Sequence, residues 1–309
     1  MAKRKILFYS THDWSNSGHR LCAAINRHST RYSIDYFVME QHAFGYDRGP
    51  GCLTSLVNGQ VYENHDAVTR LHFAAKHADI LHFKEDEGAP NSVAGVKLDL
   101  TRPVVQHFCG SQWRVNWEYI WPNCAEFVNK VIITTPDLRM PGVGGITIPF
   151  AFDETRYLPI PRDDSRVFIG HIPSNEGRKG SSVIREVCEV VRDENPNVSL
   201  SFLNKVPSDV ALRYKQLNDI YIDQINEIGT YGNAAVEAMM FGSATLCSMS
   251  TDRCGIVSVT ADTLHDVLAT LVTDRDALRH AQELAYARFL RLHSYPAVCA
   301  AIEKVYDEV

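Results

Sequence analysis

The sequence predicts an α/β fold with two doubly wound domains. Apolar runs typical of buried parallel strands alternate with helix-forming segments along the chain. The 309 residues exceed the roughly 250–300 at which a single core stops growing. A proline-rich segment ending in charged residues, ITIPFAFDETRYLPIPRDDSR, interrupts the alternation near the middle and is typical of a linker. We therefore expect one domain over residues 1–150 and a second beginning at residue 151.

The composition excludes several classes of protein. Apolar residues make up 45% of the chain and charged residues 22%, which is ordinary for a soluble globular protein. The apolar run after the basic N-terminus, ILFY, is shorter than a signal peptide needs, and no stretch approaches the length of a membrane span. The 8 cysteines form no CxxC pair, so the sequence contains no zinc or redox motif. We expect reduced thiols in a cytoplasmic protein.

The charge is distributed unevenly between the two halves. Residues 1–150 carry 15 basic and 14 acidic residues, whereas residues 151–309 carry 16 basic and 23 acidic residues. This asymmetry favours two units with different tasks. The acidic total argues against extensive nucleic-acid binding, which relies on a basic surface.

The first half begins with a strand, a polar loop, a helix and a second strand, in the runs KILFYS, THDWSNSGHR, LCAAINR and YSIDYFVM. Ser17 and Gly18 lie in the loop, at the carboxyl end of the first strand, where open α/β sheets bind ligands. The loop lacks the GxGxxG pattern, so a plain turn remains the alternative. Residues 41–66 show little periodicity and are expected to form a loop region.

A second polar group in this half follows the predicted strand VVQHF. Gly110 and Ser111 turn the chain there, and His107, Gln112 and Arg114 lie near the strand end. A histidine at such a place can exchange a proton near neutral pH. A structural histidine and a solvated arginine remain the alternative.

The second half opens with the strand VFIGHIP, followed by a glycine turn and an amphipathic helix, SNEGRKGSSVIREVCEVVRDENP. Arg178 and Lys179 come just before the helix. Two cations beside free backbone N–H groups make a phosphate-binding arrangement. The turn is not a Walker loop, which requires GxxxxGK[ST], and an exposed basic turn is the alternative.

The stretch DIYIDQINEIGTYGNAAVEAMMFGSA combines a strand end, a glycine turn and a helix. Its helix carries one carboxylate, Glu237, in the second turn. A strand end beside a helix N-terminus is a place for an anion or a polyol. A final strand, ATLCSM, and helices up to the C-terminus complete the second half.

These motifs together resemble a known family. IPFAFDETRYLP at the join, HIPSNEGRKGS after a strand and YIDQ…GTYGNAAVEAMMFG near the end resemble the retaining GT-B glycosyltransferases of the group-1, or GT4-like, type. The IDQ and YG pieces resemble a branch with DxxVDQ…GxYGxxxxEAM. The resemblance implies two Rossmann-like domains facing a cleft. It assigns the acceptor side to residues 1–150, the nucleotide sugar to 151–294, and a final helix, about 295–309, that packs back onto the first domain.

The resemblance also implies roles for individual residues. Glu237 would hold the ribose hydroxyls, and Lys179, supported by Arg178, would neutralise the diphosphate leaving group. We expect His107 and Lys179 to be the catalytic residues. The expected nucleotide-sugar site consists of Gly170, Asn175, Arg178, Lys179, Asp223, Thr230, Tyr231, Gly232 and Glu237. The expected acceptor side consists of Ser17, Gly18, Gln112 and Arg114.

The chain departs from the family pattern at several positions. Gly229 stands where the family has a glutamate that touches the donor sugar. Cys109 replaces the histidine before Gly110, Gln112 replaces an aspartate, and Ala244 replaces a proline. The ribose end of the site therefore matches the family better than the sugar end.

The leading hypothesis is transfer of a sugar from a nucleoside diphosphate sugar, of UDP or GDP type, to an acceptor hydroxyl with retention. Neither a metal nor a further cofactor is expected. A saccharide is the expected acceptor, and a modified base in DNA is less favoured because base flipping needs a basic cleft.

Two other functions remain open. One is a GT-B epimerase, which needs further carboxylates such as Glu85, Asp86 and Glu87, although an EDE run is usually a solvated surface. The other is a non-catalytic nucleotide-sugar-binding module, favoured by the missing glutamate at Gly229.

Overall fold

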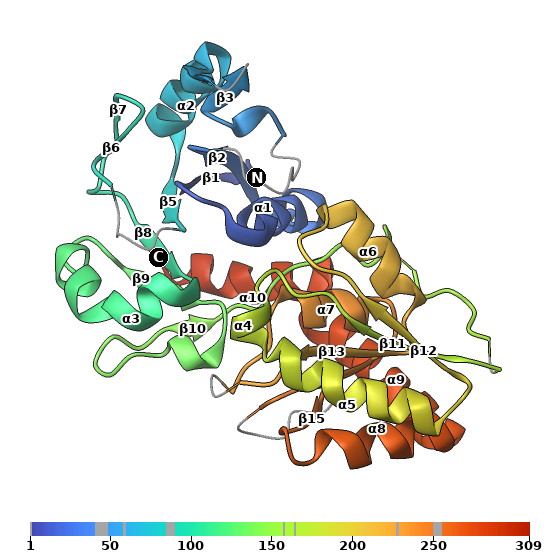
Figure 1. The fold of residues 1–309 in the computed structure, drawn as a ribbon. Coiled ribbons are helices and arrows are strands. Elements are labelled where there is room, and N and C mark those ends of the chain that lie inside the picture. The colour runs from blue at the N-terminus through green and yellow to red at the C-terminus, as the bar shows by residue number, and fades with distance from the viewer. Residues whose placement is uncertain are drawn as a thin grey trace. The chain divides into compact units, whose positions relative to one another are not determined.

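The computed structural model describes residues 2–40, 49–57, 60–84, 90–156, 158–163, 165–226, 229–249 and 255–309. The chain divides into two compact units, residues 1–151 with 295–309, and residues 152–294. Each unit contains a parallel sheet and helices, which confirms the α/β class (Figure 1). The acidic run at residues 85–87 lies outside the described residues.

The sheet of the first unit consists of six strands. Their order is β10 (Ile146–Thr147), β9 (Lys130–Ile133), β8 (Val104–Phe108), β5 (Ile80–Phe83), β1 (Arg4–Ser10) and β2 (Tyr32–Val38). All neighbouring strands pair in parallel. Parallel sheets are usually covered on both faces, and the side chains of β1 accordingly alternate between two cores. Ile6 and Phe8 point into one core, Leu7 and Tyr9 into the other.

The α-helices in the described part of this unit are α1 (Ser17–His28), α2 (His65–His77), α3 (Gly110–Ile120) and α10 (Tyr295–Asp307). Two short antiparallel pairs, β3 (Thr54–Val57) with β4 (Gln60–Glu63) and β6 (Ser92–Val93) with β7 (Val96–Lys97), lie outside the main sheet. The expectation of a plain loop over residues 41–66 is therefore wrong for β3 and β4. The reason is local: an Asn-Gly dipeptide joins two short runs there, which is a hairpin signal.

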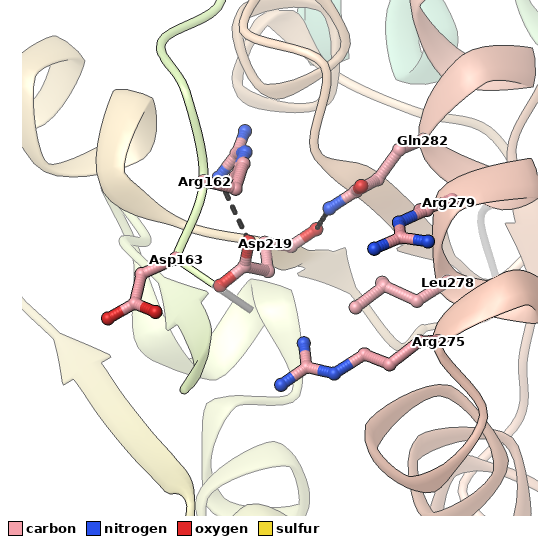
Figure 2. A pocket seen from close by; sticks show the side chains of 7 residues that line it. All are labelled: Arg162, Asp163, Asp219, Arg275, Leu278, Arg279 and Gln282. Atoms are coloured by element: carbon pink, nitrogen blue, oxygen red, sulfur yellow. Dashed lines mark hydrogen bonds and ion pairs between the residues drawn. The ribbon is translucent and has the colours of Figure 1, made fainter. Parts of the chain in front are cut away.

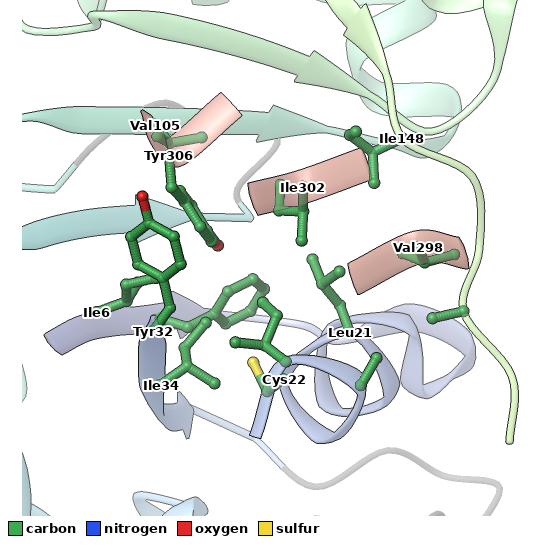
Figure 3. Close-up of a cluster of buried hydrophobic side chains, with 14 of the residues drawn as sticks. Ile6, Leu21, Cys22, Tyr32, Ile34, Val105, Ile148, Val298, Ile302 and Tyr306 are labelled. Atoms are coloured by element: carbon green, nitrogen blue, oxygen red, sulfur yellow. The ribbon is translucent and has the colours of Figure 1, made fainter. Parts of the chain in front are cut away.

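The last helix of the chain closes the core of the first unit. Val298 and Ile302 of α10 pack with Leu21 of α1 and with Ile6 of the sheet (Figure 3). Full burial of such a side chain contributes roughly 1.5–3 kcal/mol. On the outside, Arg31 binds Asp307 and a second carboxylate of α10. This helix therefore belongs to the first unit although it follows the second in sequence.

The second unit contains a five-stranded parallel sheet. Its order is β12 (Val198–Phe202), β11 (Val167–His171), β13 (Ile220–Gln224), β14 (Ala244–Cys247) and β15 (Val257–Ser258). Its helices are α4 (Glu176–Lys179), α5 (Ser181–Glu194), α6 (Ser208–Leu217), α7 (Asn233–Met240), α8 (Leu264–Thr273) and α9 (Arg275–Leu292).

Strand β13 shows how the sequence builds this unit. Ile220 and Ile222 point to the face covered by α5 and α8, and Tyr221 points to the face with α6 and α7. All three side chains are buried, because helices lie on both faces. The polar residues Asp223 and Gln224 then end the strand at the carboxyl edge of the sheet. This edge carries the candidate site.

Candidate functional site

Lys179 lies at the centre of a polar cluster at the carboxyl edge of β13. Its Nζ donates to Asp223 Oδ1 at 2.9 Å and to Gln224 Oε1 at 2.5 Å. The Asp223 side chain is 1% exposed, whereas that of Lys179 is 17% exposed. Strand β13 thus supplies two acceptors that orient one ammonium group, and the side chain that carries this ammonium is partly exposed to solvent.

Asp223 joins this ammonium to the start of α7. Its Oδ2 accepts the backbone N–H of Gly232, the residue before α7, at 2.9 Å. Burial alone would raise the pKa of Asp223, but the Lys179 charge and the Gly232 N–H outweigh it, so this pKa lies below its ordinary value. A cation and a helix N-terminus therefore converge on one carboxylate, and both donors are of the kind that binds phosphate.

Gly232 leaves the space that this arrangement needs. A Cβ built there would lie 3.3 Å from Lys179 Nζ and 3.6 Å from Asp223 Oδ2. Any side chain would press on the ammonium. The turn before Gly232 is fixed by Gln224, whose Nε2 donates to the Thr230 carbonyl at 2.5 Å.

The turn that carries Lys179 is held by backbone contacts. Asn175 caps α4 by accepting the Arg178 N–H at 3.0 Å, and the Lys179 carbonyl accepts the Ile225 N–H at 3.0 Å. Gly180 then turns the chain with φ 69°, and its added Cβ would lie 2.3 Å from the Ile225 carbonyl oxygen. Only glycine fits both the left-handed backbone and this close approach.

Glu237 forms an ion pair that the sequence did not indicate. Its Oε2 accepts from Lys215 Nζ at 2.5 Å, and the two side chains are 11% and 4% exposed. Lys215 comes from α6 and also lies over the Tyr221 ring, 5.5 Å from its centroid. The expected ribose ligand is therefore a carboxylate held in place by a buried counter-ion.

Behind the cluster, His171 connects three elements of the second unit. Its Nδ1 lies 2.8 Å from the Ile222 carbonyl and its Nε2 2.7 Å from Ser181 Oγ. A carbonyl only accepts, so Nδ1 carries the proton and Nε2 accepts from the hydroxyl. Burial lowers the pKa of His171, which agrees with this neutral form. The histidine thereby holds the start of α5, just after Lys179, against the sheet.

Tyr231 leans away from the cluster toward α9. Its hydroxyl lies 3.2 Å from His293 Nε2 and accepts from Arg288 Nη2 at 3.4 Å, and Arg288 lies over the ring at 5.3 Å. Tyr231 thus fixes the turn. On either side of it, the Thr230 carbonyl binds Gln224 and the Gly232 N–H binds Asp223.

Three predicted residues of this unit remain: Asn175, Arg178 and Gly170. Asn175 and Arg178 are exposed. Gly170 is buried inside β11, where an added Cβ would lie 1.9 Å from Asn218 Nδ2. Packing therefore accounts for the glycine at this position, and the structure gives no support to the ligand role expected for it.

The first unit contains a second lysine–aspartate pair that sequence reasoning missed. Lys84 Nζ lies 3.0 Å from Asp13 Oδ1, and both side chains are fully buried. Asp13 also accepts the N–H of Gly18 at 2.7 Å, the N–H of His19 at 2.9 Å and the Tyr36 hydroxyl at 2.9 Å. The aspartate thus occupies the N-terminus of α1.

Two predicted residues, Ser17 and Gly18, form the first turn of α1. An added Cβ at Gly18 would lie 2.8 Å from the Phe8 ring. Both residues are buried, and the Gly18 N–H already binds Asp13. The prediction that both residues lie in the loop before the helix is wrong, because α1 already begins at Ser17. The anion at this helix N-terminus is the chain's own carboxylate, Asp13.

His107 lies inside the sheet and is 4% exposed. Burial, together with the Lys84 charge, lowers its pKa to about 3. Among the described residues neither ring nitrogen has a hydrogen-bond partner, and the His82 ring lies 5.5 Å away. The premise that His107 exchanges a proton near neutral pH is therefore wrong, because burial keeps the ring uncharged there.

Gln112 and Arg114 lie on α3. Gln112 is exposed, and its Oε1 accepts from Asn116 Nδ2 at 2.7 Å. Arg114 binds Asp137 Oδ2 through Nε at 3.0 Å and Nη2 at 2.5 Å. This ion pair fastens α3 to the segment after β9, which gives Arg114 a structural task.

The described residues offer neither a metal-binding cluster nor a membrane-spanning helix. No group of three or more His, Cys, Asp or Glu side chains in the described ranges is placed to hold a metal ion. No helix in the described part of the chain is long and apolar enough to cross a membrane.

Comparison of the structure with solved proteins places the fold. Neither a protein-family model nor a curated protein sequence matches the chain. HepE from Anabaena, solved with UDP and glucose, is similar with a TM-score of 0.63 at 14% identity, over 99% of this chain and 100% of that chain. The chain has a GT-B fold.

Two further solved proteins are similar to the chain. A TarM variant from S. aureus, solved with UDP and a GlcNAc-glycerol, matches with a TM-score of 0.58 and 13% identity over 82% of this chain and 62% of that chain. A Listeria monocytogenes protein assigned as a UDP-N-acetylglucosamine 2-epimerase matches with a TM-score of 0.58 and 11% identity over 100% and 98%. At these identities the similarity shows the fold alone.

Proposed function

We propose that this protein is a retaining glycosyltransferase that moves a sugar from a nucleoside diphosphate sugar to an acceptor hydroxyl. The observation that carries the proposal is the convergence of the Lys179 ammonium and the Gly232 N–H at the carboxyl edge of a parallel sheet. Such edges bind ligands in open α/β sheets, and helix N-termini bind phosphate. HepE, of the same fold, holds UDP-glucose. We propose a UDP-sugar as the donor.

Lys179 has the properties of a leaving-group stabiliser. Negative charge develops on the diphosphate as the glycosidic bond breaks, and a preoriented cation acts mainly on that charge. Asp223 and Gln224 orient Lys179 before the donor arrives, so little reorganisation is needed. The proposal assigns Asp223 and Gln224 as positioning residues, and Arg178 as an exposed second cation at the same turn.

Glu237 is proposed to accept hydrogen bonds from the ribose hydroxyls. Its contact with Lys215 keeps a carboxylate in the second turn of α7 although the side chain is 11% exposed. A carboxylate accepts several hydrogen bonds, so one bound to an ammonium retains capacity for a diol. The Gly229 position, where the family has a glutamate, has only a backbone to offer the sugar.

A saccharide is the proposed acceptor. In the first unit the residues expected on the acceptor side are engaged within the unit, Gly18 with Asp13 and Arg114 with Asp137.

The test begins with donor recognition. A thermal-shift panel of UDP-, GDP-, ADP- and dTDP-sugars should show stabilisation by UDP-sugars, by about 2.7 kcal/mol at one hundred times Kd. Incubation of the selected donor with a saccharide panel should then release UDP and give a product whose anomeric configuration equals that of the donor. Stabilisation by none of these donors would overturn the proposal, and inversion would overturn the retaining mechanism.

Epimerisation is the second candidate, because the Listeria protein matches the chain over its whole length. An epimerase converts the sugar of UDP-N-acetylglucosamine without an acceptor. NMR of this nucleotide sugar incubated with the protein alone separates the two activities. Appearance of the 2-epimer would favour the epimerase, and donor binding without any turnover would favour a non-catalytic binding module.

A further inference from the structure

A groove lies at the amino edge of the sheet in the first unit. Its volume is about 570 Å³, and it is lined by Lys97, Leu98, Asp99, Leu100, Thr101 and Phe127. The lining residues 97–101 come before β8, and Phe127 comes before β9. Strand β8 has 5 residues and spans about 16 Å, so the groove is separate from Gln112 and Arg114, which follow the other end of this strand.

The cavity drawn in Figure 2 belongs to the second unit and differs in kind. Its volume is about 290 Å³, and its lining is mostly charged: Arg162, Asp163, Asp219, Arg275, Leu278, Arg279 and Gln282. Arg162 lies 3.6 Å from Asp219, whose carbonyl accepts from Gln282 Nε2 at 3.1 Å. The Arg275 charge favours the ionised forms of both Asp163 and Asp219. The charges of this cavity are thus balanced within the unit, and we assign it no ligand.

The two walls of the groove in the first unit are fixed by hydrogen bonds to neighbouring elements. Asn129 ties the segment that carries Phe127 to β8, because its Oδ1 accepts the Val104 N–H at 2.7 Å and its N–H donates to the Val104 carbonyl at 2.9 Å. On the other wall, Arg102 follows the lining residues and donates through Nη1 to the Ala78 carbonyl, just after α2, at 2.6 Å. A ligand would therefore enter a preformed site, which lowers the entropic cost of binding.

The inner surface of the groove is apolar. Leu98 is 3% exposed and belongs to the core between β1 and α2, and Leu100 packs against the same core. At the rim, Phe127 is 37% exposed. An aromatic ring that remains in contact with solvent offers a flat apolar surface against which a ligand can stack.

Polar groups lie beside this apolar surface. Asp99 Oδ1 accepts the hydroxyl and the N–H of Thr101, at 2.6 and 3.2 Å, and these bonds lower the pKa of Asp99. Asp99 Oδ2 lies 3.4 Å from Arg102 Nε, and the Asp99 side chain is 51% exposed. A carboxylate has about four acceptor sites, so Asp99 keeps capacity for further donors. Lys97 is exposed as well and supplies N–H donors.

These features together select a class of ligand. The lining combines one carboxylate with one ammonium, so it favours neither a strong anion nor a strong cation. The apolar surface requires an apolar partner, whereas Asp99 and Lys97 require groups that donate and accept hydrogen bonds. A sugar ring presents both, because its C–H groups form an apolar face and its hydroxyl groups lie around the edge.

We propose that this groove binds a saccharide, with the C–H face of one sugar ring on Phe127 and its hydroxyl groups bonded to Asp99 and Lys97. The volume lies within the range of about 300–1,000 Å³ for small-molecule sites, whose lining is typically apolar with a few polar groups. Such a site would hold a saccharide without taking part in a transfer reaction. The proposal does not depend on the proposed function.

The test measures saccharide binding by the full chain in the absence of a nucleotide sugar. Isothermal titration uses two probes, maltotetraose, which is neutral, and tetragalacturonate, which is acidic. The variants are Phe127→Ala and Asp99→Asn, and Phe73→Ala is the matched control. Phe73 is a 61% exposed aromatic residue of α2 and does not line the groove.

The proposal predicts saturable binding of at least one probe to the wild type and to the Phe73→Ala control. Phe127→Ala should weaken this binding by about tenfold, since the stacking surface is lost, and Asp99→Asn by about threefold, since a charged acceptor becomes a neutral one. Binding of neither probe to the wild type, or equal affinities of Phe127→Ala and Phe73→Ala, would overturn the proposal.

Sedimentation of the same proteins examines the competing occupant of the groove, a second copy of the chain. Self-association that Phe127→Ala abolishes, without binding of either saccharide, would replace the proposal with a contact between copies. Far-ultraviolet circular dichroism confirms that each variant is folded.

Discussion

The two units contain the same small arrangement in two different environments. In each, a lysine at the carboxyl edge of a parallel sheet binds an aspartate, and that aspartate accepts a backbone N–H at a helix start. Lys84, Asp13 and α1 form it in the first unit, and Lys179, Asp223 and α7 form it in the second. The ammonium–carboxylate distances are 3.0 and 2.9 Å. The geometry is shared, so it does not by itself indicate function.

Access to solvent is what separates the two arrangements. Lys84 and Asp13 are fully buried, whereas Lys179 is 17% exposed. A sealed ion pair has no room for a ligand and acts on the fold, since a buried charge that loses its partner is costly. A half-open pair can exchange its internal carboxylate contact for a bound phosphate. We therefore assign a structural role to the Lys84–Asp13 pair and a ligand-binding role to the Lys179–Asp223 pair.

The largest effect is expected at the sealed pair. Lys84→Met removes the Lys84 ammonium from the buried Asp13 carboxylate, which should lower the free energy of unfolding by about 3–5 kcal/mol. Urea denaturation measures this loss in the free energy of unfolding. The matched change Lys179→Met should cost less, about 1–3 kcal/mol, because Asp223 is buried but keeps the Gly232 N–H and the Lys179 side chain is partly solvated. Equal losses for the two variants would remove the distinction drawn between the pairs.

A second buried pair tests whether the nucleotide site rests on a rigid support. Lys215→Met removes the Lys215 ammonium from Glu237 and should reduce the free energy of unfolding by about 3 kcal/mol. Arg213→Met, an exposed position on the same helix, is the control and should change it by less than about 0.5 kcal/mol. Differential scanning calorimetry of both variants gives the comparison. A Lys215→Met protein as stable as its control would show that the pair contributes nothing.

Gly232→Ala is expected to act on binding more than on stability. The added methyl group, 3.3 Å from Lys179 Nζ, displaces the ammonium, so the affinity for the nucleotide sugar should fall about tenfold, or about 1.4 kcal/mol. Gly177→Ala serves as control, because its nearest contact, Asn175 Oδ1 at 3.7 Å, is an ordinary one. Calorimetric titration of both variants with a UDP-sugar measures this affinity. Unchanged affinity in Gly232→Ala would mean that the ammonium has room to move.

A pH dependence is also expected, and it comes from the first unit. His107 has a pKa of about 3 in the folded protein and an ordinary value of 6.5, so the unfolded chain binds the extra proton between these values. The free energy of unfolding should therefore fall as the pH drops below 6.5, by up to about 1.4 kcal/mol per unit. His107→Gln should flatten this slope in denaturation curves between pH 7 and 5. His65→Gln, at an exposed histidine, should leave the slope as in the wild type, and an unchanged slope in His107→Gln would contradict the burial argument.

The sequence predicts the candidate site better where its residues are local. Lys179 and Gly232 each stand beside a glycine turn and a helix start, so the pattern alone indicates an anion site, and β13 brings the two turns together. The partners Lys215 and Lys84 could not be found this way. Each pairs with a carboxylate that is 22 or 71 residues away, and nothing local marks a lysine that will be buried.

The fold shows the same limit. The alternation of strands and helices predicts both parallel sheets, because buried parallel strands give continuous apolar runs. The β3–β4 hairpin was missed although Asn58 and Gly59 signal it, because its strands are short and β4 is exposed, which leaves little apolar periodicity. For His107, strand position was predicted, but its pKa depends on burial by residues from other strands.

The most direct test of the central assignment is the effect of Lys179→Met on nucleotide-sugar use. The measurement is the rate of sugar transfer with the selected donor and acceptor, alongside the unfolding free energy of the same preparation. We expect a rate lower by about 10²–10³-fold, with a loss of stability of no more than about 3 kcal/mol. A variant that transfers sugar at the wild-type rate would contradict the assignment of this open lysine as the group that stabilises the leaving diphosphate.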